Sequence, residues 1–438
     1  MTLFRPLRMS LRAPSLVIAS LLLATACASA PARPPVQIGT GDPRVDPVPG
    51  DPYIIDNGEV GDGGLEDLDL GENVVRGDGL VPPHMKGRDI KRAAVLLPFS
   101  HPNASVRAEA ESMLAGIELA LFEYADDNFL IIPKDTAGKT SVAEARTNEA
   151  LIEGADVILG PLFGANVKAV REIAIKESVP VIAFSNDRSA AGGGAYLASV
   201  APEEEVTRAM DYAVSRGVQS FVFLGPNSNY GRRVEAAMRT QAARLGAAVL
   251  SSALYDPATT APVEEARRIA SVLKAESRRA PNRVAVMIPE RGVKLLSVAP
   301  LLPYNGVDLR LIKIMGTGLW ADESVWREPT LYKGFFAGPN PEDQEAFETT
   351  FQRIYGRQPT DLAAVSYDAA AMSVRLAIDD AMTYRGVTDS DGFYGVNGLF
   401  RFRSDGTSER GLSILQIEPD EGAVLAQEGR KEFTDIDS

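Results

Sequence analysis

The sequence predicts an α/β fold that contains two successive units of parallel β-sheet. Short apolar runs alternate with longer amphipathic segments from residue 92 onwards, as buried strands alternate with helices in parallel sheets. The alternation restarts after residue 200, so a second doubly wound unit follows the first. A third observation is residues 155–187, where a strand, a helix and a second strand follow one another within about 30 residues, the length of a β-α-β unit.

Residues 155–187 also predict a binding site. Residues 157–159 form an apolar run that stops at Gly160-Pro161, and residues 179–184 repeat the buried-strand pattern. Between them, one helix face carries Val167, Val170, Ile173 and Ala174. The loops after the two strands, residues 160–166 and 184–189, are small and polar. Ligands of open α/β sheets bind at the carboxyl ends of the strands, where these loops lie.

The remaining elements of the first unit come from the same patterns. Residues 92–98, 129–132 and 196–200 are predicted strands, and residues 105–124 are a predicted helix rich in Ala, Glu and Leu. Ser141-Val-Ala-Glu144 is a capping-box pattern, which predicts a helix that begins there and ends near Gly154.

The second unit begins with Pro202, which favours the first turn of a helix ending at Gly217. Predicted strands follow at residues 221–224, 248–255, 284–288, 309–315 and 331–337, and predicted helices at residues 232–246, 262–279 and 293–302. Residues 341–355 and 361–384 predict two long helices with no strand between them, which we assign to the first unit. Finally, residues 399–403 and 412–417 flank Ser404-Asp-Gly406, which predicts a hairpin.

Composition excludes several classes of function. The chain has 438 residues and a formal net charge of −14, which argues against nucleic acid and anionic membrane surfaces as partners. Cys27 is the only cysteine, so neither an intramolecular disulfide nor a thiolate zinc site can form. With His84 and His101 as the only histidines and no phosphate-binding loop or nucleophile elbow, we expect no enzyme activity, cofactor or metal.

The N-terminus predicts a secretory signal over residues 1–26. Three arginines precede an apolar stretch at residues 14–23 that is too short for a stable membrane span. Ala24-Thr25-Ala26-Cys27 resembles the lipobox of bacterial lipoproteins, although leucine is commoner where Ala24 stands. The resemblance implies lipidation of Cys27, and Ala28 after it implies sorting to the outer membrane. The alternative is an ordinary signal peptidase site beside an idle cysteine.

Residues 27–90 predict an extended tether. Proline, glycine and acidic residues dominate this segment, and large apolar residues are sparse. Such a segment cannot bury enough surface to offset its chain entropy. We therefore expect a disordered acidic segment between a membrane anchor and a folded body.

Residues 92–425 resemble the type I periplasmic binding proteins of the leucine-binding kind. Four stretches carry the resemblance: residues 156–161 (DVILGP), 178–183 (SVPVIA), 230–232 (YGR), and 367–369 (YDA) with 398–406 (GLFRFRSDG). It implies two doubly wound parallel-sheet lobes, joined by three crossovers, with a ligand cleft between them. We expect lobe 1 at residues 91–203 and 338–396, lobe 2 at residues 204–337 and 397–428, and a flexible tail at residues 429–438.

The candidates for residues that face the cleft are Phe163, Gly164, Asn166, Ser185, Asn186, Asp187, Tyr230, Glu290, Thr317 and Trp320. The alternative for Trp320, an aromatic after a strand end, is a patch that faces a protein partner. In the amino-acid binders of the family, the loop after the Gly-Pro turn offers a hydroxyl to the ligand carboxylate. Here that position is Gly164. The acid that pairs with the ligand ammonium is expected after Met315-Gly316, where no acid occurs before Asp322. These departures argue against a free α-amino acid as the ligand.

Residues 315–320, 331–340, 351–355 and 367–369 resemble the ligand-binding-like domain of penicillin-binding-protein activator lipoproteins. Those outer-membrane lipoproteins stimulate peptidoglycan synthases, and their better-known members carry a helical-repeat domain that the tether replaces here. The resemblance implies a non-enzymatic activator, held in the periplasm by a lipid in the inner leaflet of the outer membrane, with a penicillin-binding protein as partner. The alternative is the solute-binding component of an ABC transporter for branched-chain amino acids or similar solutes, with a small-molecule ligand and a permease as partners.

Overall fold

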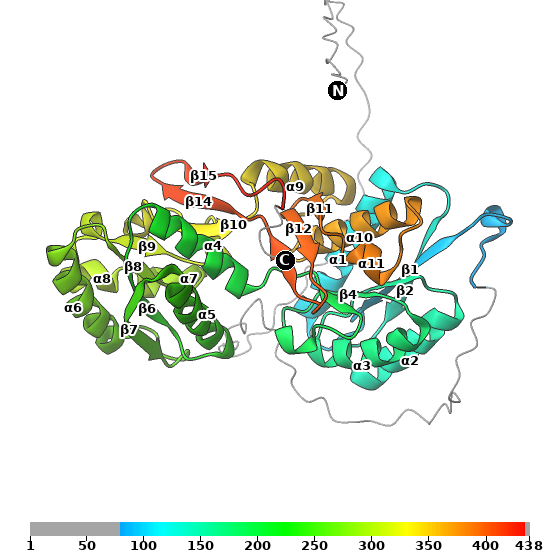
Figure 1. Cartoon of the computed structure of the whole chain (residues 1–438), viewed down its shortest axis with the longest axis horizontal. Coiled ribbons are helices and arrows are strands. Elements are labelled where there is room, and N and C mark those ends of the chain that lie inside the picture. The colour runs from blue at the N-terminus through cyan, green and yellow to red at the C-terminus, as the bar shows by residue number, and fades with distance from the viewer. Residues whose placement is uncertain (1–78, 434–438) are drawn as a thin grey trace, which may run out of the picture. The chain divides into compact units, whose positions relative to one another are not determined.

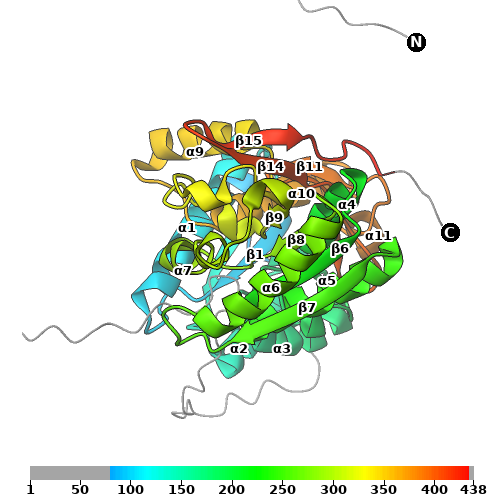
Figure 2. The ribbon, with the colours of Figure 1, turned by 90° about the vertical axis from the view of Figure 1, so that its left-hand side faces the viewer.

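The computed structural model describes residues 79–433, which lie in one compact unit (Figures 1 and 2). The predictions for Cys27, the signal peptide and most of the tether lie outside the described residues. Residues 79–90 contact the folded body: the Leu80 N–H donates to the Glu153 carbonyl at 2.8 Å, and Met85 and Ile90 are buried.

The first sheet is parallel throughout, with strand order β2-β1-β3-β4-β5. Its strands are β1 (Lys91–Leu97), β2 (Phe129–Asp135), β3 (Val157–Leu159), β4 (Val181–Ala183) and β5 (Ala195–Leu197). Helices α2 (Thr140–Ile152) and α3 (Gly164–Ala174) cover one face, and α1 (Ala104–Tyr124) covers the other. Alternate residues of β1 divide between these faces, as in any strand buried on both sides. We call this part lobe 1.

The second sheet has strand order β15-β14-β10-β9-β8-β6-β7. Five strands are parallel: β6 (Ser220–Pro226), β7 (Ala248–Tyr255), β8 (Val284–Met287), β9 (Lys313–Met315) and β10 (Phe335–Gly338). Two antiparallel strands, β14 (Ser413–Glu418) and β15 (Gly422–Gln427), complete one edge. We call this part lobe 2.

Helices cover both faces of the second sheet. The face formed by Phe221 and Phe223 packs under α4 (Pro202–Ser215) and α5 (Asn229–Leu245). The face formed by Val222 and Leu224 packs under α6 (Val263–Arg279), α7 (Gly292–Val298) and α8 (Leu301–Tyr304). Figure 2 looks onto lobe 2 from the side of α6. The predicted fold class, α/β with two doubly wound lobes, is confirmed.

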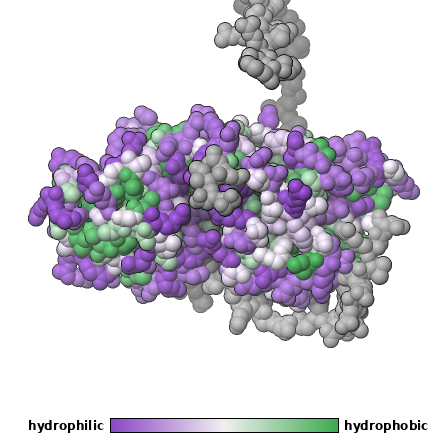
Figure 3. Space-filling model, viewed as in Figure 1, coloured by the Kyte–Doolittle hydropathy of each residue, from purple (hydrophilic) through white to green (hydrophobic). Residues whose placement is uncertain are grey.

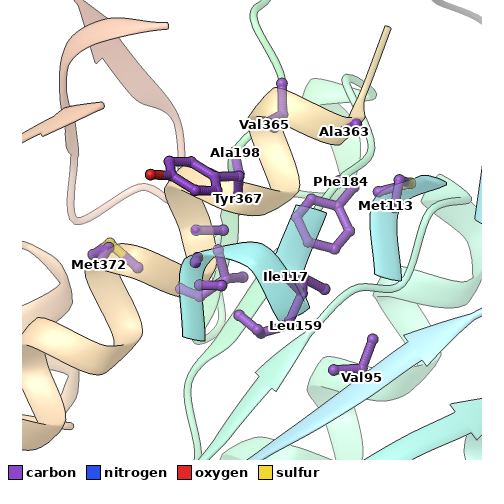
Figure 4. Close-up of a cluster of buried hydrophobic side chains, with 14 of the residues drawn as sticks. Val95, Met113, Ile117, Leu159, Phe184, Ala198, Ala363, Val365, Tyr367 and Met372 are labelled. Atoms are coloured by element: carbon purple, nitrogen blue, oxygen red, sulfur yellow. The ribbon is translucent and has the colours of Figure 1, made fainter. Parts of the chain in front are cut away.

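Two later helices, α9 (Pro341–Tyr355) and α10 (Ala363–Ile378), pack against α1. Close approach is possible because Gly116 faces α10: a Cβ there would lie 2.4 Å from the Ala363 carbonyl oxygen. Ser366 Oγ donates to the Met113 carbonyl at 2.8 Å. Figure 4 shows part of the core of lobe 1, in which Ile117 of α1 lies near Leu159 of β3; Tyr367 of α10 belongs to the same cluster.

The C-terminal hairpin differs from the prediction. After the short helix α11 (Tyr384–Val387), strands β11 (Phe393–Gly395), β12 (Gly398–Phe402) and β13 (Ser408–Arg410) form a small antiparallel sheet. β12 therefore pairs with residues 408–410, whereas residues 413–418 join the sheet of lobe 2. The turn is tighter than expected because the Arg403 N–H donates to the Thr407 carbonyl at 2.8 Å.

Some helix ends lie where the sequence predicts them, and one predicted helix start does not. α4 begins at Pro202, as predicted, and α5 ends at Gly246, whose φ of 64° is left-handed. The predicted capping box at Ser141 is wrong, because α2 begins one residue earlier and its N-cap residue, Lys139, makes no side-chain capping bond.

Candidate functional site

Two general observations limit the kind of site. Within residues 79–433, no helix combines the length and apolar character needed to span a bilayer. Within the same residues, no group of His, Cys, Asp and Glu side chains is arranged to hold a metal ion. Ligands of open α/β sheets bind at the carboxyl ends of the strands, and the loops there are described next.

The lobe 1 loops bring together the predicted residues that follow β3. The Gly160-Pro161 peptide bond is cis, and α3 begins shortly after it at Gly164. Phe163 is buried against the His101 ring, with 5.6 Å between ring centroids. Asn166 is also buried: its Oδ1 accepts from Thr140 Oγ1 at 3.0 Å, while its Nδ2 has no hydrogen-bond partner among the described residues.

The Asp187 carboxylate lies against Gly164, at the N-terminus of α3. A Cβ on Gly164 would lie 2.7 Å from Asp187 Oδ2, so the glycine is required by its neighbour. Asp187 Oδ1 accepts from the Ser189 N–H at 3.0 Å and Oγ at 2.8 Å, and Ser185 Oγ accepts from the Asp187 N–H at 3.1 Å. A negative charge is favourable at a helix N-terminus. A carboxylate of the chain itself therefore occupies the neighbourhood in which the resemblance expects a ligand carboxylate.

In lobe 2, the predicted residues are bonded to their own lobe. Tyr230 and Thr317 are buried, and the tyrosine hydroxyl donates to Thr317 Oγ1 at 2.7 Å. The Tyr255 hydroxyl donates to Glu290 Oε1. Burial, reinforced by the charge of Glu290, raises the pKa of Tyr255 well above its usual range. Glu290 therefore accepts a hydrogen bond from a protonated partner.

Trp320 belongs to the core of lobe 2. Its side chain is fully buried, its Nε1–H donates to the Ile288 carbonyl at 3.0 Å, and its ring packs against Phe336. Gly316 makes room for it, because a Cβ there would lie 2.2 Å from the indole. Trp320 thus fixes the loop that carries Thr317.

The sequence missed two charged residues beside the predicted set. Glu205 of α4 is buried and accepts a hydrogen bond from the Gly318 N–H; burial raises the pKa of its carboxyl to about 8. The loop after β9 therefore has an acid against it, supplied from a helix more than 100 residues earlier. Arg233 of α5 pairs with Glu203 through two bonds of 3.0 and 2.9 Å and donates to the Asn186 carbonyl at 3.1 Å. It thereby joins lobe 2 to lobe 1.

Sequence signals for these two residues are weak. Glu205 belongs to the run Glu203-Glu204-Glu205, which is also the ordinary composition of a first helical turn. Arg233 lies one turn after Tyr230 and adjoins the Tyr-Gly-Arg stretch that carries the resemblance. Only the topology shows that both side chains point inwards.

Two cavities lie away from most of the predicted residues. A cavity of about 630 Å³ lies between α4, α5 and the β12–β13 hairpin, and of the ten predicted residues only Asn186 lines it. A second, of about 890 Å³, lies in lobe 1 beside α10 and β11 and includes none of the ten. Its lining includes Phe347, Tyr367 and Phe393 together with acidic side chains.

Comparison with known proteins agrees with this architecture. Residues 92–423 match the sequence model of a family described as periplasmic binding protein. No curated protein matches the sequence significantly. Among solved structures, a putative branched-chain amino acid ABC transporter protein from Rhodospirillum rubrum is similar with a TM-score of 0.65 and 16% identity, over 77% of this chain and 99% of that chain.

Two further structures are similar to the chain. One is an ABC transporter substrate-binding protein from Desulfitobacterium hafniense, in complex with Leu, with a TM-score of 0.55 and 16% identity over 76% of this chain and 99% of that chain. The other is full-length LpoA from Haemophilus influenzae, with a TM-score of 0.59 and 16% identity; the match covers 77% of this chain but 59% of LpoA. Identities this low bear on the fold alone. The family match extends over most of the chain, and the chain therefore belongs to the periplasmic binding protein family.

Proposed function

We propose that this protein is a non-enzymatic regulator that binds a penicillin-binding protein and stimulates peptidoglycan synthesis, with its two-lobed fold serving as an interaction scaffold. The observation that carries the proposal is the Asp187 carboxylate against Gly164 at the start of α3. The cleft holds a negative charge of its own where an amino-acid ligand would bring its carboxylate.

The electrostatic argument is direct. Two like charges about 4 Å apart repel by about 4 kcal/mol at the effective dielectric constant of a protein surface. A ligand carboxylate at α3 would have to overcome this repulsion or displace Asp187 from its two bonds to Ser189. Tyr230, Thr317 and Trp320 are likewise bonded within lobe 2. An amino-acid carboxylate is therefore a poor match for the cleft.

We choose a penicillin-binding protein as the partner because the sequence resembles penicillin-binding-protein activator lipoproteins. The structural similarity to LpoA supports this choice. In this proposal, a lipid on Cys27 anchors the chain to the inner leaflet of the outer membrane. The acidic segment that follows lets the folded body reach a synthase in the periplasm.

A binding experiment tests the partner. The purified chain is immobilised, and the cognate bifunctional penicillin-binding proteins of the same organism are passed over it at physiological salt. The proposal expects saturable binding of at least one synthase. Failure of every synthase to bind would contradict the proposal.

One observation favours the alternative, a solute-binding component of an ABC transporter. The Asn166 Nδ2 donor is buried in the predicted cleft without a hydrogen-bond partner among the described residues, and buried donors are normally satisfied. A transport protein would show a concentration-dependent rise in Tm with a small ligand. A thermal-shift screen over amino acids and aromatic acids therefore separates the two functions: a clear, saturable rise favours transport.

A further inference from the structure

The cavity between α4, α5 and the β12–β13 hairpin has an unusual charge. We call it the arginine groove and define it by its charged residues: seven arginines (Arg188, Arg208, Arg233, Arg244, Arg403, Arg410 and Arg430) and four acids (Glu203, Glu204, Asp211 and Glu409). The lining therefore carries three net positive charges, in a chain whose formal net charge is −14. α4, α5 and β12 can be located in Figure 1, and hydrophilic side chains dominate this face in Figure 3.

Two of the four acids of the groove, Glu203 and Glu409, form ion pairs with three of its seven arginines. Glu203 is held by Arg233. The Glu409 carboxylate forms ion pairs with three guanidinium groups: its oxygens lie 3.0, 3.2 and 3.8 Å from nitrogens of Arg401, Arg403 and Arg430. Burial raises the pKa of the Glu204 carboxyl to about 7, which reduces its negative charge at neutral pH.

Four arginines of the groove, Arg188, Arg208, Arg244 and Arg410, form no ion pair with any residue in the described part of the chain. Arg208 donates to two backbone carbonyls, those of Leu412 at 2.7 Å and Glu428 at 3.3 Å. Arg244 is exposed, and its Nη1 donates to the neutral Gln241 side chain at 3.4 Å. These guanidinium groups therefore make no direct ion-pair contact with a carboxylate of the described residues, although Asp211 lies in the field of Arg208.

Arg410 is the most constrained of the four. Its Nη2 donates to the Ala198 carbonyl, and its guanidinium lies 5.2 Å from the centroid of the Phe400 ring. Its Nε and Nη1 atoms are shielded from solvent and have no hydrogen-bond partner among residues 79–433. Unsatisfied buried donors of a guanidinium are costly, and a bound anion is one way to compensate for them.

We propose that the arginine groove binds a small anion that carries at least two phosphate or carboxylate charges. Guanidinium groups present forked donors that match both oxyanions, and the net lining charge matches two to three negative charges. The volume of about 630 Å³ lies within the range of small-molecule sites. Of the ten residues predicted for the cleft, only Asn186 lines the groove, where Arg233 donates to its carbonyl.

Titration calorimetry and thermal unfolding of the purified chain test the proposal. The probes are sodium pyrophosphate and trisodium citrate, each compared with sodium chloride at the same ionic strength. The proposal expects saturable binding of pyrophosphate, citrate or both, with a rise in Tm that chloride does not reproduce. Preference for one probe identifies phosphate or carboxylate as the natural chemistry. If neither binds more tightly than chloride, the proposal is wrong.

Matched variants locate the site. Arg244→Gln and Arg208→Gln each remove one unpaired charge from the groove and should weaken binding about tenfold, the usual order for a charge-assisted contact. Arg244 is exposed, so its replacement should leave folding intact, which the Tm without anion checks. Arg278→Gln removes the same charge from α6, outside the groove, and should leave the Kd unchanged. Equal weakening by Arg278→Gln would overturn the proposal, because binding would then follow overall charge.

Discussion

At the scale of single residues, the site depends on pairs that only the fold brings together. Gly164 is small because the Asp187 side chain lies against it, and Glu205 is buried because α4 packs over the loop after β9. The sequence shows that Gly164 lacks a hydroxyl and that residues 315–320 lack an acid. It does not show the two carboxylates that the structure brings to these places, since each belongs to another segment.

The Gly164–Asp187 contact predicts a destabilising substitution. Gly164→Ser should lower the free energy of unfolding by about 1 to 3 kcal/mol, because its Cβ would lie 2.7 Å from Asp187 Oδ2. The loss should be much smaller in an Asp187→Ala background, where the space is free. Urea unfolding of both singles and the double variant measures the coupling. Ala165→Ser, at the exposed next position of α3, is the control; additive effects of the two substitutions would refute the contact.

Buried Glu205 predicts a pH-dependent stability. Burial raises the pKa of its carboxyl from its ordinary 4.5 to about 8 in the folded protein, so the folded state holds the proton more tightly than the unfolded state. The free energy of unfolding should therefore fall as pH rises from about 5 to 8, by at least 2 kcal/mol at about 1.4 kcal/mol per pKa unit. The nearby carboxylates of Glu203 and Glu204 repel the charge of ionised Glu205 and so raise its pKa further.

Glu205→Gln should reduce this fall but leave the part due to Glu204, whose pKa burial raises to about 7, while Glu111→Gln, at an exposed position of α1, should keep the whole fall. The measurement is chemical unfolding at pH 5, 6, 7 and 8 for the three proteins. A stability that stays level with pH in the unsubstituted protein would be inconsistent with a buried, protonated Glu205.

At the scale of elements, the alternation of buried strands and helices made most of the fold predictable. β1, β3, β7, α1, α5 and α9 lie within a few residues of their predicted ranges. The central strands β1 and β3 are buried on both faces, which leaves a continuous apolar run, and the helices carry one apolar stripe each. The hairpin partner of β12 was missed, since residues 408–410 carry no such signal and residues 412–417 do. The apolar strand instead completes the sheet of lobe 2.

The Tyr367-Asp368-Ala369 stretch predicts a large effect on stability. Buried Asp368 of α10 accepts hydrogen bonds from the Val396 N–H at 2.7 Å, the Asn397 N–H at 3.0 Å and Asn397 Nδ2 at 2.9 Å. Asp368→Ala would leave these donors unsatisfied and should lower the free energy of unfolding by about 3 kcal/mol. Asp379→Ala, at the exposed end of α10, is the matched control. Equal Tm values for the two variants would contradict this role.

At the scale of the whole molecule, the two lobes and the family were predictable from the sequence, and the ligand was not. Parallel strands and the helices between them leave local patterns in the sequence, and the fold that they build is shared with a structure of only 16% identity. The charges and hydrogen bonds that line the cleft depend on contacts between segments distant in the sequence. Examples are the contacts of Arg233 with Asn186 and of Glu205 with Gly318. Fold class alone does not decide between transport and regulation.

The most direct test of the regulatory account is the initial rate of glycan-chain polymerisation by a cognate penicillin-binding protein, measured with and without an excess of the purified chain. The account predicts a rate increase of at least twofold that saturates with the chain and is unaffected by free leucine, because Asp187 opposes an amino-acid carboxylate in the cleft. An unchanged rate for every cognate synthase, together with a saturable rise in Tm on adding leucine, would contradict the account and favour transport.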